Sequence, residues 1–491
     1  MNANAQRASA GYRGARRDKN MSMFDAVRRA YAEFLTLPTC IIFAFLLLAA
    51  GTYVLDHVQS PWLNLVRRTL QTRMFGDPTA TSDLLGTIAS SITTVTSITI
   101  SVLLLAVQQA AGSLTHQVFD QFLRRRQNQF HFGFFIGLAL YALVTLATVN
   151  ESFNPVLGAT VALLLTIIAL LLLLLLLYST IDQMRPAEII DAIHDLTLVA
   201  RQRQMDWIRK TRRSCRYGGT LCVSVATTHH GFVTGIDVDA IGRAVQAAAG
   251  ELEVVLRISI GSYVASSDVL ADINAQSPEG SEAVAKVVCE AVRIERQRDI
   301  DIDPAYGIEE LEMIGWTSIS TAKSDPDPGL LTIRALRDLL ARWSNEQETN
   351  SAAAAVPVVY QDNVLTQLMN AFESLAVVAS ESMQHQTITE IMQTFGLMFE
   401  RLPPEQRRRA EDLVLRSLSA LGEHVLTAPL DAALSALIST FRAAGCVSTA
   451  VAVKNAQDRL ALSVGELNSR SSRAGGKAPE TRREAPVERR Q

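Results

Sequence analysis

Recognisable catalytic motifs are missing from this sequence of 491 residues. It contains no phosphate-binding loop, no nucleophile elbow, no HExxH zinc motif and no dinucleotide-binding glycine fingerprint. Each of these motifs places a reactive or ligand-holding group at a fixed spacing, so their absence argues against the corresponding chemistries. We therefore predict a non-enzymatic protein with no catalytic residues, no cofactor and no metal site.

The sequence also has few cysteines and a small net charge. The five cysteines are scattered, with no CxxC pair and no zinc-like spacing, which favours free thiols in a reducing compartment over a disulfide framework. The formal net charge is only −3, which argues against a nucleic-acid partner for the whole protein.

Charge is most depleted in the first 180 residues, where residues 132–178 carry only Glu151. A helix needs about 20 apolar residues to cross a bilayer, and it satisfies all of its own backbone groups there. Four segments meet this condition. The sequence predicts transmembrane helices at about 38–55, 84–111, 130–149 and 156–178, with the lipid bilayer as a partner. Gly133, Gly137 and Ala142 are spaced to permit close helix contact in the third.

The distribution of Lys and Arg predicts the orientation, because cytoplasmic loops are enriched in both residues. Arginines crowd the leader, the segment after the fourth helix, and the loop after the second helix at Arg124, Arg125 and Arg126. We expect a multi-pass protein of the cell inner membrane with both termini in the cytoplasm. The loop from Asp56 to Asp83 would then be outside, and its three arginines are discordant with that placement.

Several segments form a family-like pattern. The hydroxyl-rich second helix is followed by the basic run Phe122–Gln129, and then by the motif Gly133–Tyr141. Two later segments, His229–Ile241 and Asp303–Ser320, fit the same pattern. Together they resemble predicted bacterial membrane proteins catalogued as domain of unknown function 2254, over about residues 30–345. The resemblance implies a topology but no activity. The loop Ser320–Pro328 departs from the family's sequence, and a function carried by that loop would be lost or altered here.

After the fourth helix, the sequence predicts a cytoplasmic α+β region made of a small β-barrel-like element and helices. Alternating apolar residues indicate strands between residues 220 and 273, in a pattern similar to biotinyl and lipoyl half-barrels. Those domains carry their cofactor on a lysine, and no lysine lies between Lys210 and Lys286, which excludes a covalent swinging arm.

The expected organisation has seven parts. They are a basic cytoplasmic leader (1–35), the transmembrane region (36–178), a juxtamembrane helix (179–217), an α+β module (218–345), a linker (346–357), a helical module (358–467) and a disordered tail (468–491). The juxtamembrane helix has an apolar side and an arginine-rich side. The arginines would either contact anionic headgroups or serve only as solvated topology signals.

Two groups of residues are candidate metal ligands. Asp299, Asp301 and Asp303, with Asp325 and Asp327, would suit Mg²⁺ or Ca²⁺, but the calcium-loop spacing fails. A solvated acidic edge or a helix cap is the favoured interpretation. His229 and His230 are adjacent, so on a strand they would point to opposite sides, which disfavours a joint metal site.

The most suggestive feature is a polar stripe on the second helix. Ser90, Thr94, Ser97, Ser101 and Gln108 recur at spacings that place them on one helical face. They would either line a water-filled path in a homo-oligomer or hydrogen-bond between packed helices. No charged residue lies inside this helix, which disfavours an ion-coupled pump. The sequence thus predicts an oligomeric pore or transport-related protein, or alternatively a membrane-tethered scaffold or sensor that binds a cytoplasmic protein partner.

Overall fold

The computed structural model describes residues 35–58, 61–113, 126–151, 153–183, 185–216, 221–248, 251–275, 278–320, 325–346, 356–421 and 424–462. The chain divides into two compact units, residues 1–188 and residues 189–491, which we call the membrane unit and the second unit. Each is described by itself. The expected disordered tail, residues 468–491, lies outside the described residues.

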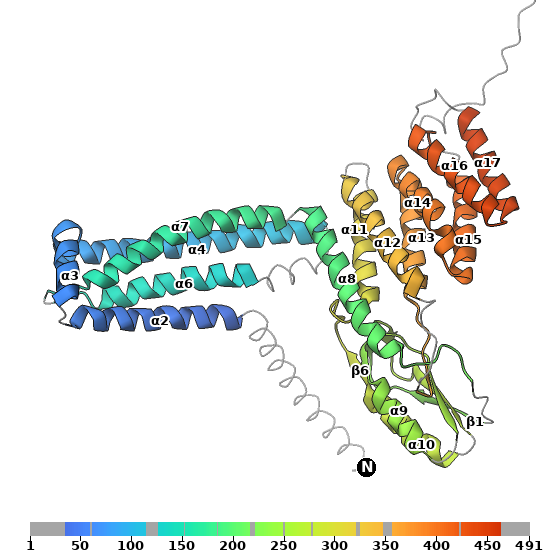
Figure 1. The fold of residues 1–491 in the computed structure, drawn as a ribbon, viewed down its shortest axis with the longest axis horizontal. Helices are drawn as coiled ribbons and strands as arrows, with labels where there is room; N and C mark the ends of the chain where they lie inside the picture. The colour runs from blue at the N-terminus through green and yellow to red at the C-terminus, as the bar shows by residue number, and fades with distance from the viewer. Residues whose placement is uncertain are drawn as a thin grey trace, which may run out of the picture. The chain divides into compact units, whose positions relative to one another are not determined.

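The membrane unit consists of long helices that run side by side, with one short helix at their end (Figure 1). They are α2 (Thr36–His57), α3 (Pro61–Arg73), α4 (Pro78–Ser113), α6 (Arg126–Ala147) and α7 (Val156–Gln183). Four of them, all but the short α3, are long and apolar enough to cross a membrane. The four predicted candidate spans are therefore confirmed, although α4 begins earlier than expected.

Helix α6 is the centre of this unit. It packs against α2, α4 and α7, and 56% of its most apolar window is buried, against 17% for α7. A Cβ on Gly133 would lie 2.9 Å from Pro38 Cα, and a Cβ on Gly137 would lie 2.6 Å from the Phe45 ring. The expected close contact is therefore real, and α2 is the helix that makes it. Leu170, Leu171, Leu174 and Leu175 of α7 face outward, as lipid contact requires, whereas Leu176 is buried in the core of the unit.

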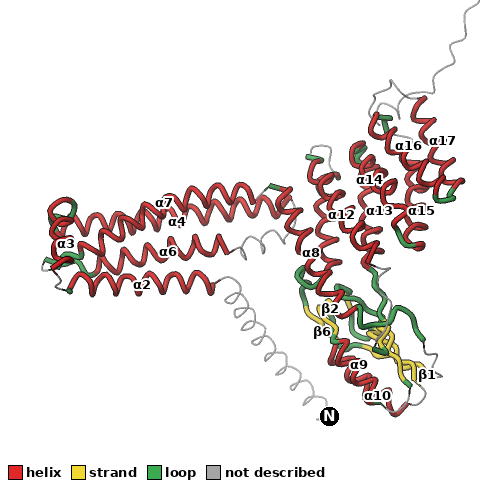
Figure 2. Tube along the Cα trace, viewed as in Figure 1, coloured by secondary structure: helices red, strands yellow, loops and turns green. Residues whose placement is uncertain are grey.

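The strands of the second unit form two small open sheets (Figure 2). The strands are β1 (Leu221–Ala226), β2 (Gly231–Ile236), β3 (Leu252–Leu256), β4 (Tyr263–Val264), β5 (Val269–Ala275), β6 (Val292–Glu295) and β7 (Val358–Val359). One sheet has the order β1-β5-β3-β7 and the other the order β4-β2-β6.

The expected barrel-like element was wrong, because the described strands close no barrel. Helix α9 (Val238–Ala247) separates β2 from β3, so that β3 pairs with β5 while β2 pairs with β4 and β6. Strand β7 lies beyond the expected linker and adds to β3 in parallel. The alternating pattern identified most strands correctly, but their partners are set by segments far away in the chain.

Helices make up the rest of the second unit. They are α8 (Pro186–Ile208), α10 (Pro278–Ala291), α11 (Pro304–Ile319), α12 (Asp327–Glu346), α13 (Val364–Glu381), α14 (His385–Met398), α15 (Pro404–Leu421), α16 (Ala428–Ala443) and α17 (Val447–Leu462), with a short 3₁₀ turn, η2 (Phe399–Arg401), before α15. Prolines begin α8, α11 and α15, where the missing N–H costs nothing.

Helix α8 corrects the expectation of a basic helix continuing from α7. Pro186 starts a new helix, and the basic residues largely contact the protein itself. Arg201 is buried in ion pairs, and Arg203 donates to the Asp301 carbonyl at 2.9 Å. Further along, Arg212 pairs with the buried Glu253 at 2.9 Å. Arg201, Arg203 and Arg212 therefore bond to the second unit itself.

Candidate functional site

The polar stripe lies on the outward face of α4. Ser90, Thr94, Ser97 and Ser101 are all exposed. The opposite side of the helix is buried against α6 and α7, through Leu85, Ile88, Ala89, Ile92, Thr96 and Thr99. The side chain of the fifth stripe residue, Gln108, lies outside the described residues. The four described stripe residues therefore take no part in packing α4 against the described helices of its own unit.

The stripe hydroxyls are partly engaged by the helix itself. Thr94 Oγ1 donates to the Ser90 carbonyl at 2.8 Å, and Ser101 Oγ donates to the Ser97 carbonyl at 2.9 Å. Such bonds satisfy the donor and leave oxygen lone pairs directed away from the helix. The Ser90, Thr94 and Ser101 hydroxyls can therefore meet lipid without a lost hydrogen bond, and they can equally accept bonds from water or from a neighbouring helix.

Of the predicted basic cluster, Arg124 and Arg125 lie outside the described residues. Arg126 is the first residue of α6, and its side chain is exposed. An exposed arginine at the end of a candidate span suits the role of a topology signal.

A polar cluster near one end of the membrane unit was not identified from the sequence. The Asp56 carboxylate of α2 accepts from the Leu157 and Gly158 backbone N–H groups, both at 3.1 Å, and so satisfies the start of α7. Tyr141 Oη donates to the Gly158 carbonyl at 3.0 Å. These bonds join α2, α6 and α7. An acidic residue at the end of a predicted span was the one available signal.

In the second unit, the family-like segments meet around Arg298. Its guanidinium pairs with Asp303 at 2.7 Å and with Glu309, and it lies over the rings of Phe232 and Tyr306. Phe232 belongs to the segment His229–Ile241, and the other three partners belong to Asp303–Ser320. Arg298 therefore joins two motifs that are about 70 residues apart in the chain.

Most residues of the second motif have a structural role. The Asp303 side chain caps α11 by accepting from the Tyr306 N–H at 3.2 Å. Gly307 packs directly against α8, because a Cβ there would lie 1.9 Å from Thr197 Oγ1. The motif thus builds the contact between α11, α8 and the sheet region, and the helix-cap interpretation of Asp303 is confirmed.

A second arginine of this unit is fully buried. Arg201, with only 2% of its surface exposed, makes two bonds to the Asp362 carboxylate, at 3.1 and 2.6 Å, and one to Glu346 at 3.1 Å. Burial alone would lower the pKa of Arg201, but the two carboxylates outweigh it, so that the pKa is raised. The Arg201 side chain therefore stays ionised. Its bonds join α8 to the end of α12 and to Asp362, just before α13.

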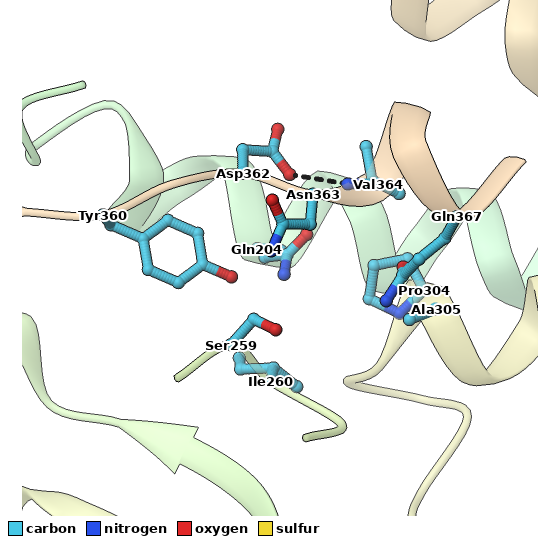
Figure 3. A pocket seen from close by; sticks show the side chains of 10 residues that line it. All are labelled: Gln204, Ser259, Ile260, Pro304, Ala305, Tyr360, Asp362, Asn363, Val364 and Gln367. Carbon is cyan, nitrogen blue, oxygen red and sulfur yellow. Dashed lines mark hydrogen bonds between the residues drawn. The ribbon is translucent and has the colours of Figure 1, made fainter. Parts of the chain in front are cut away.

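A small pocket opens beside this ion pair, where α8, the loop after β3 and the first turns of α11 and α13 meet. Figure 3 shows the Tyr360 hydroxyl, Ser259 and the Gln204 amide around a common space. Burial raises the pKa of Tyr360, so that the phenol keeps its proton. The lining therefore offers neutral hydrogen-bonding groups, and the Asp362 carboxylate in it is already paired with Arg201. Such a lining suits a water molecule.

The weighed metal candidates are dispersed. His229 and His230 are both exposed in the turn between β1 and β2. Asp299 accepts from the Asp301 backbone at 3.0 Å, and Asp303 caps α11. Among the described residues, no three His, Cys, Asp or Glu side chains gather as a metal site would require. Part of the altered loop Ser320–Pro328, residues 321–324, lies outside the described residues.

Comparison with known proteins gives one match. The model of a family described as a predicted membrane protein (DUF2254) matches residues 32–393, well over half of the chain. No curated protein and no solved structure matches. The matched region begins before α2 and ends within α14, so it covers all four candidate spans, both sheets and the clusters around Arg298 and Arg201.

Proposed function

This chain belongs to the predicted membrane protein family DUF2254, and from that premise we propose that it is an oligomeric pore or transport-related protein, in which copies of α4 surround a polar path. The observation that carries the proposal is the exposed stripe Ser90–Thr94–Ser97–Ser101, directly opposite the packed side of α4. A helix that served only as an anchor would present leucine on this face, as α7 does.

The chemistry of such a path follows from the side chains. Hydroxyl oxygens with satisfied donors can replace part of the hydration shell of a solute, while no charged group in the described part of α4 between Asp83 and Ser101 selects one sign of charge. We therefore expect a weakly selective, water-filled path for small solutes or ions. One copy has the stripe on its outside, so the function requires a homo-oligomer.

Planar-bilayer conductance of the purified protein tests the proposal. The wild type should be oligomeric and should carry current, and Ser97→Leu should abolish most of that current by placing an apolar side chain in the path. Ser91→Leu is the matched control, because Ser91 is exposed on α4 but lies beside the stripe. A monomer that carries no current, or an equal loss in both variants, would contradict the pore.

The proposed orientation has both termini in the cytoplasm of a bacterial cell, with α3 on the outer side. The discordant arginines of the segment between α2 and α4 are partly explained, since Arg67 donates to the Leu55 and Val58 carbonyls at the end of α2. An arginine held in this way has a packing role, so its position does not depend on topology alone. Reporter fusions after Gln491 should be active only for cytoplasmic reporters, and periplasmic activity would reverse the orientation.

A membrane-tethered scaffold or sensor is the second candidate, and an exposed aromatic residue favours it. On α11, Trp316 and Met313 are 40% and 54% exposed and lie about one turn apart. Tryptophan is enriched among residues that dominate protein interfaces. The partner would be a cytoplasmic protein with an apolar recess. Chemical cross-linking of the full-length protein in cells should yield a defined adduct that Trp316→Ala removes and Leu397→Ala, an exposed control on α14, retains.

A further inference from the structure

The short helix α3 joins the end of one candidate span to the start of another. Helix α2 ends at His57 and α4 begins at Pro78, and α3 lies between them at one end of the membrane unit (Figure 1). A segment that connects two neighbouring spans on the same side has to lie near the boundary between hydrocarbon and water.

Specific contacts fix α3 against the end of the membrane unit. Arg67 donates to the Leu55 carbonyl at 2.9 Å and to the Val58 carbonyl at 3.3 Å, and its Nε lies 3.7 Å from Asp56 Oδ1. Leu70 packs against the apolar core of the unit, and Phe75, just after the helix, is buried in that core. One side of α3 is therefore docked on protein.

The other side of α3 is open and amphipathic. Trp62 and Leu65 are 70% and 66% exposed. Thr69 and Thr72 follow on the same face, and their hydroxyls donate to the Leu65 and Arg68 carbonyls, at 2.9 and 2.7 Å. These two donors are satisfied within the helix, so contact with lipid would not deprive them of a partner. Arg68 is exposed at the border of the face.

We propose that this open face of α3 rests in the interfacial region of a phospholipid bilayer. Trp62 and Leu65 would enter the upper part of the acyl chains, and Arg68 would lie at the level of the phosphates. Tryptophan is enriched in this region, because its ring is apolar and its N–H seeks a polar partner. The inference does not depend on the pore, since a monomer would make the same contact.

Two observations favour lipid over a second copy of the chain. Exposed apolar residues also lie at the end of α2, just before α3, on a helix that is itself a candidate span; they are Val54, Leu55 and Val58. The open face of α3 also offers only two large apolar side chains, and a stable protein interface needs about 800 Å² on each partner.

Tryptophan quenching by brominated lipid tests the contact. The chain has four tryptophans, and the other three, Trp207, Trp316 and Trp343, belong to the second unit. Full-length protein is reconstituted in vesicles of phosphatidylcholine brominated near the headgroup end or near the methyl end of the chains. We expect the shallow bromines to quench a share of the wild-type emission that Trp62→Phe lacks and that Trp316→Phe retains, with weaker quenching by deep bromines.

Equal quenching of wild type and Trp62→Phe would overturn the proposal, and so would no quenching of either. Stronger quenching by the deep bromines than by the shallow ones would also overturn it, because Trp62 would then lie inside the span region. Far-UV circular dichroism of each variant guards against misfolding. Leu65→Cys, made in a variant whose five native cysteines are replaced by serine and labelled with an environment-sensitive dye, provides an independent readout. Its emission should shift to the blue on reconstitution and show the same preference for shallow bromines.

Discussion

The two units satisfy buried acids in different ways. In the membrane unit, the carboxylate of Asp56 is bonded to backbone N–H groups at the start of α7. In the second unit, Asp362 and Asp303 are likewise placed beside helix starts, but each is also paired with an arginine, the buried Arg201 or the largely buried Arg298. The nearest arginine, Arg67, lies 3.7 Å from the Asp56 carboxylate, beyond hydrogen-bond distance, so the backbone N–H groups are the direct partners of this acid. Pairing with arginine joins several segments at once, and the loss of one partner breaks an ion pair inside the protein.

The largest expected effect comes from removing the buried arginine of the second unit. Arg201→Ala removes the cation that Asp362 and Glu346 share, and removing one member of a buried ion pair costs about 3–5 kcal/mol of unfolding free energy. Chemical denaturation of the full-length protein, followed by tryptophan fluorescence, measures the loss. One of the four tryptophans, Trp343, has its ring centroid 5.6 Å from the Arg201 guanidinium carbon.

Two variants calibrate that result. Arg201→Lys keeps the charge but loses the two-bond geometry, and it should fall between wild type and Arg201→Ala. Arg342→Ala removes an exposed arginine of α12 from an i,i+4 pair and should leave the transition nearly unchanged. If Arg201→Ala resembled Arg342→Ala, the contrast between the two units would fail.

Close packing inside the membrane unit should respond more moderately. A Cβ on Gly133 would approach the α2 backbone at Pro38, which cannot rotate away as a side chain could. We expect Gly133→Ala to cost about 1–3 kcal/mol, the usual range for overpacking. The measurement is the thermal unfolding midpoint in detergent, with Gly51→Ala as the matched control, because a Cβ at Gly51 meets nothing within 4 Å. A midpoint that falls equally in both variants would remove the specific α2–α6 contact as the cause.

Features that depend on local pattern were predictable from the sequence. Apolar length identified all four candidate spans, and the small residues Gly133 and Gly137 indicated a close contact. Asp303 and Pro304 marked the start of α11. In each case, the physical cause lies within about one turn or one span of the residue itself.

Features that depend on distant partners were not predictable. Nothing near Arg201 in the sequence indicates that its partner is Asp362, 161 residues away, so the arginines of α8 looked like a basic surface. Strand β7 begins about 100 residues after the end of β3, the strand it joins, and β6 begins more than 50 residues after the end of β2, its partner in the other sheet. The outward direction of the α4 stripe likewise required the positions of α6 and α7.

The smallest expected effect sharpens the contrast through pH. Asp272 on β5 bonds to Ser224 on β1 at 2.7 Å and to Arg257, just after β3, at 2.6 Å. Burial alone would raise the pKa of Asp272, but the two hydrogen bonds and the charge of Arg257 outweigh it, so that the folded-state pKa is below the ordinary 3.8. The folded protein thus holds the ionised form more strongly than the unfolded chain does.

A lowered folded-state pKa stabilises the fold above the unfolded value, and that stabilisation is lost as pH falls through the folded value. We expect Asp272→Asn to reduce the unfolding free energy by no more than about 1 kcal/mol near neutral pH, because the Arg257 side chain is largely exposed. The difference from wild type should hold down to about pH 5 and shrink below pH 4, as Asp272 itself becomes protonated. High salt should shrink it at neutral pH as well. If the difference in unfolding free energy between the two proteins grew as the pH fell, the ionised carboxylate would be destabilising β5. The ion pairs of the second unit would then not all stabilise the fold.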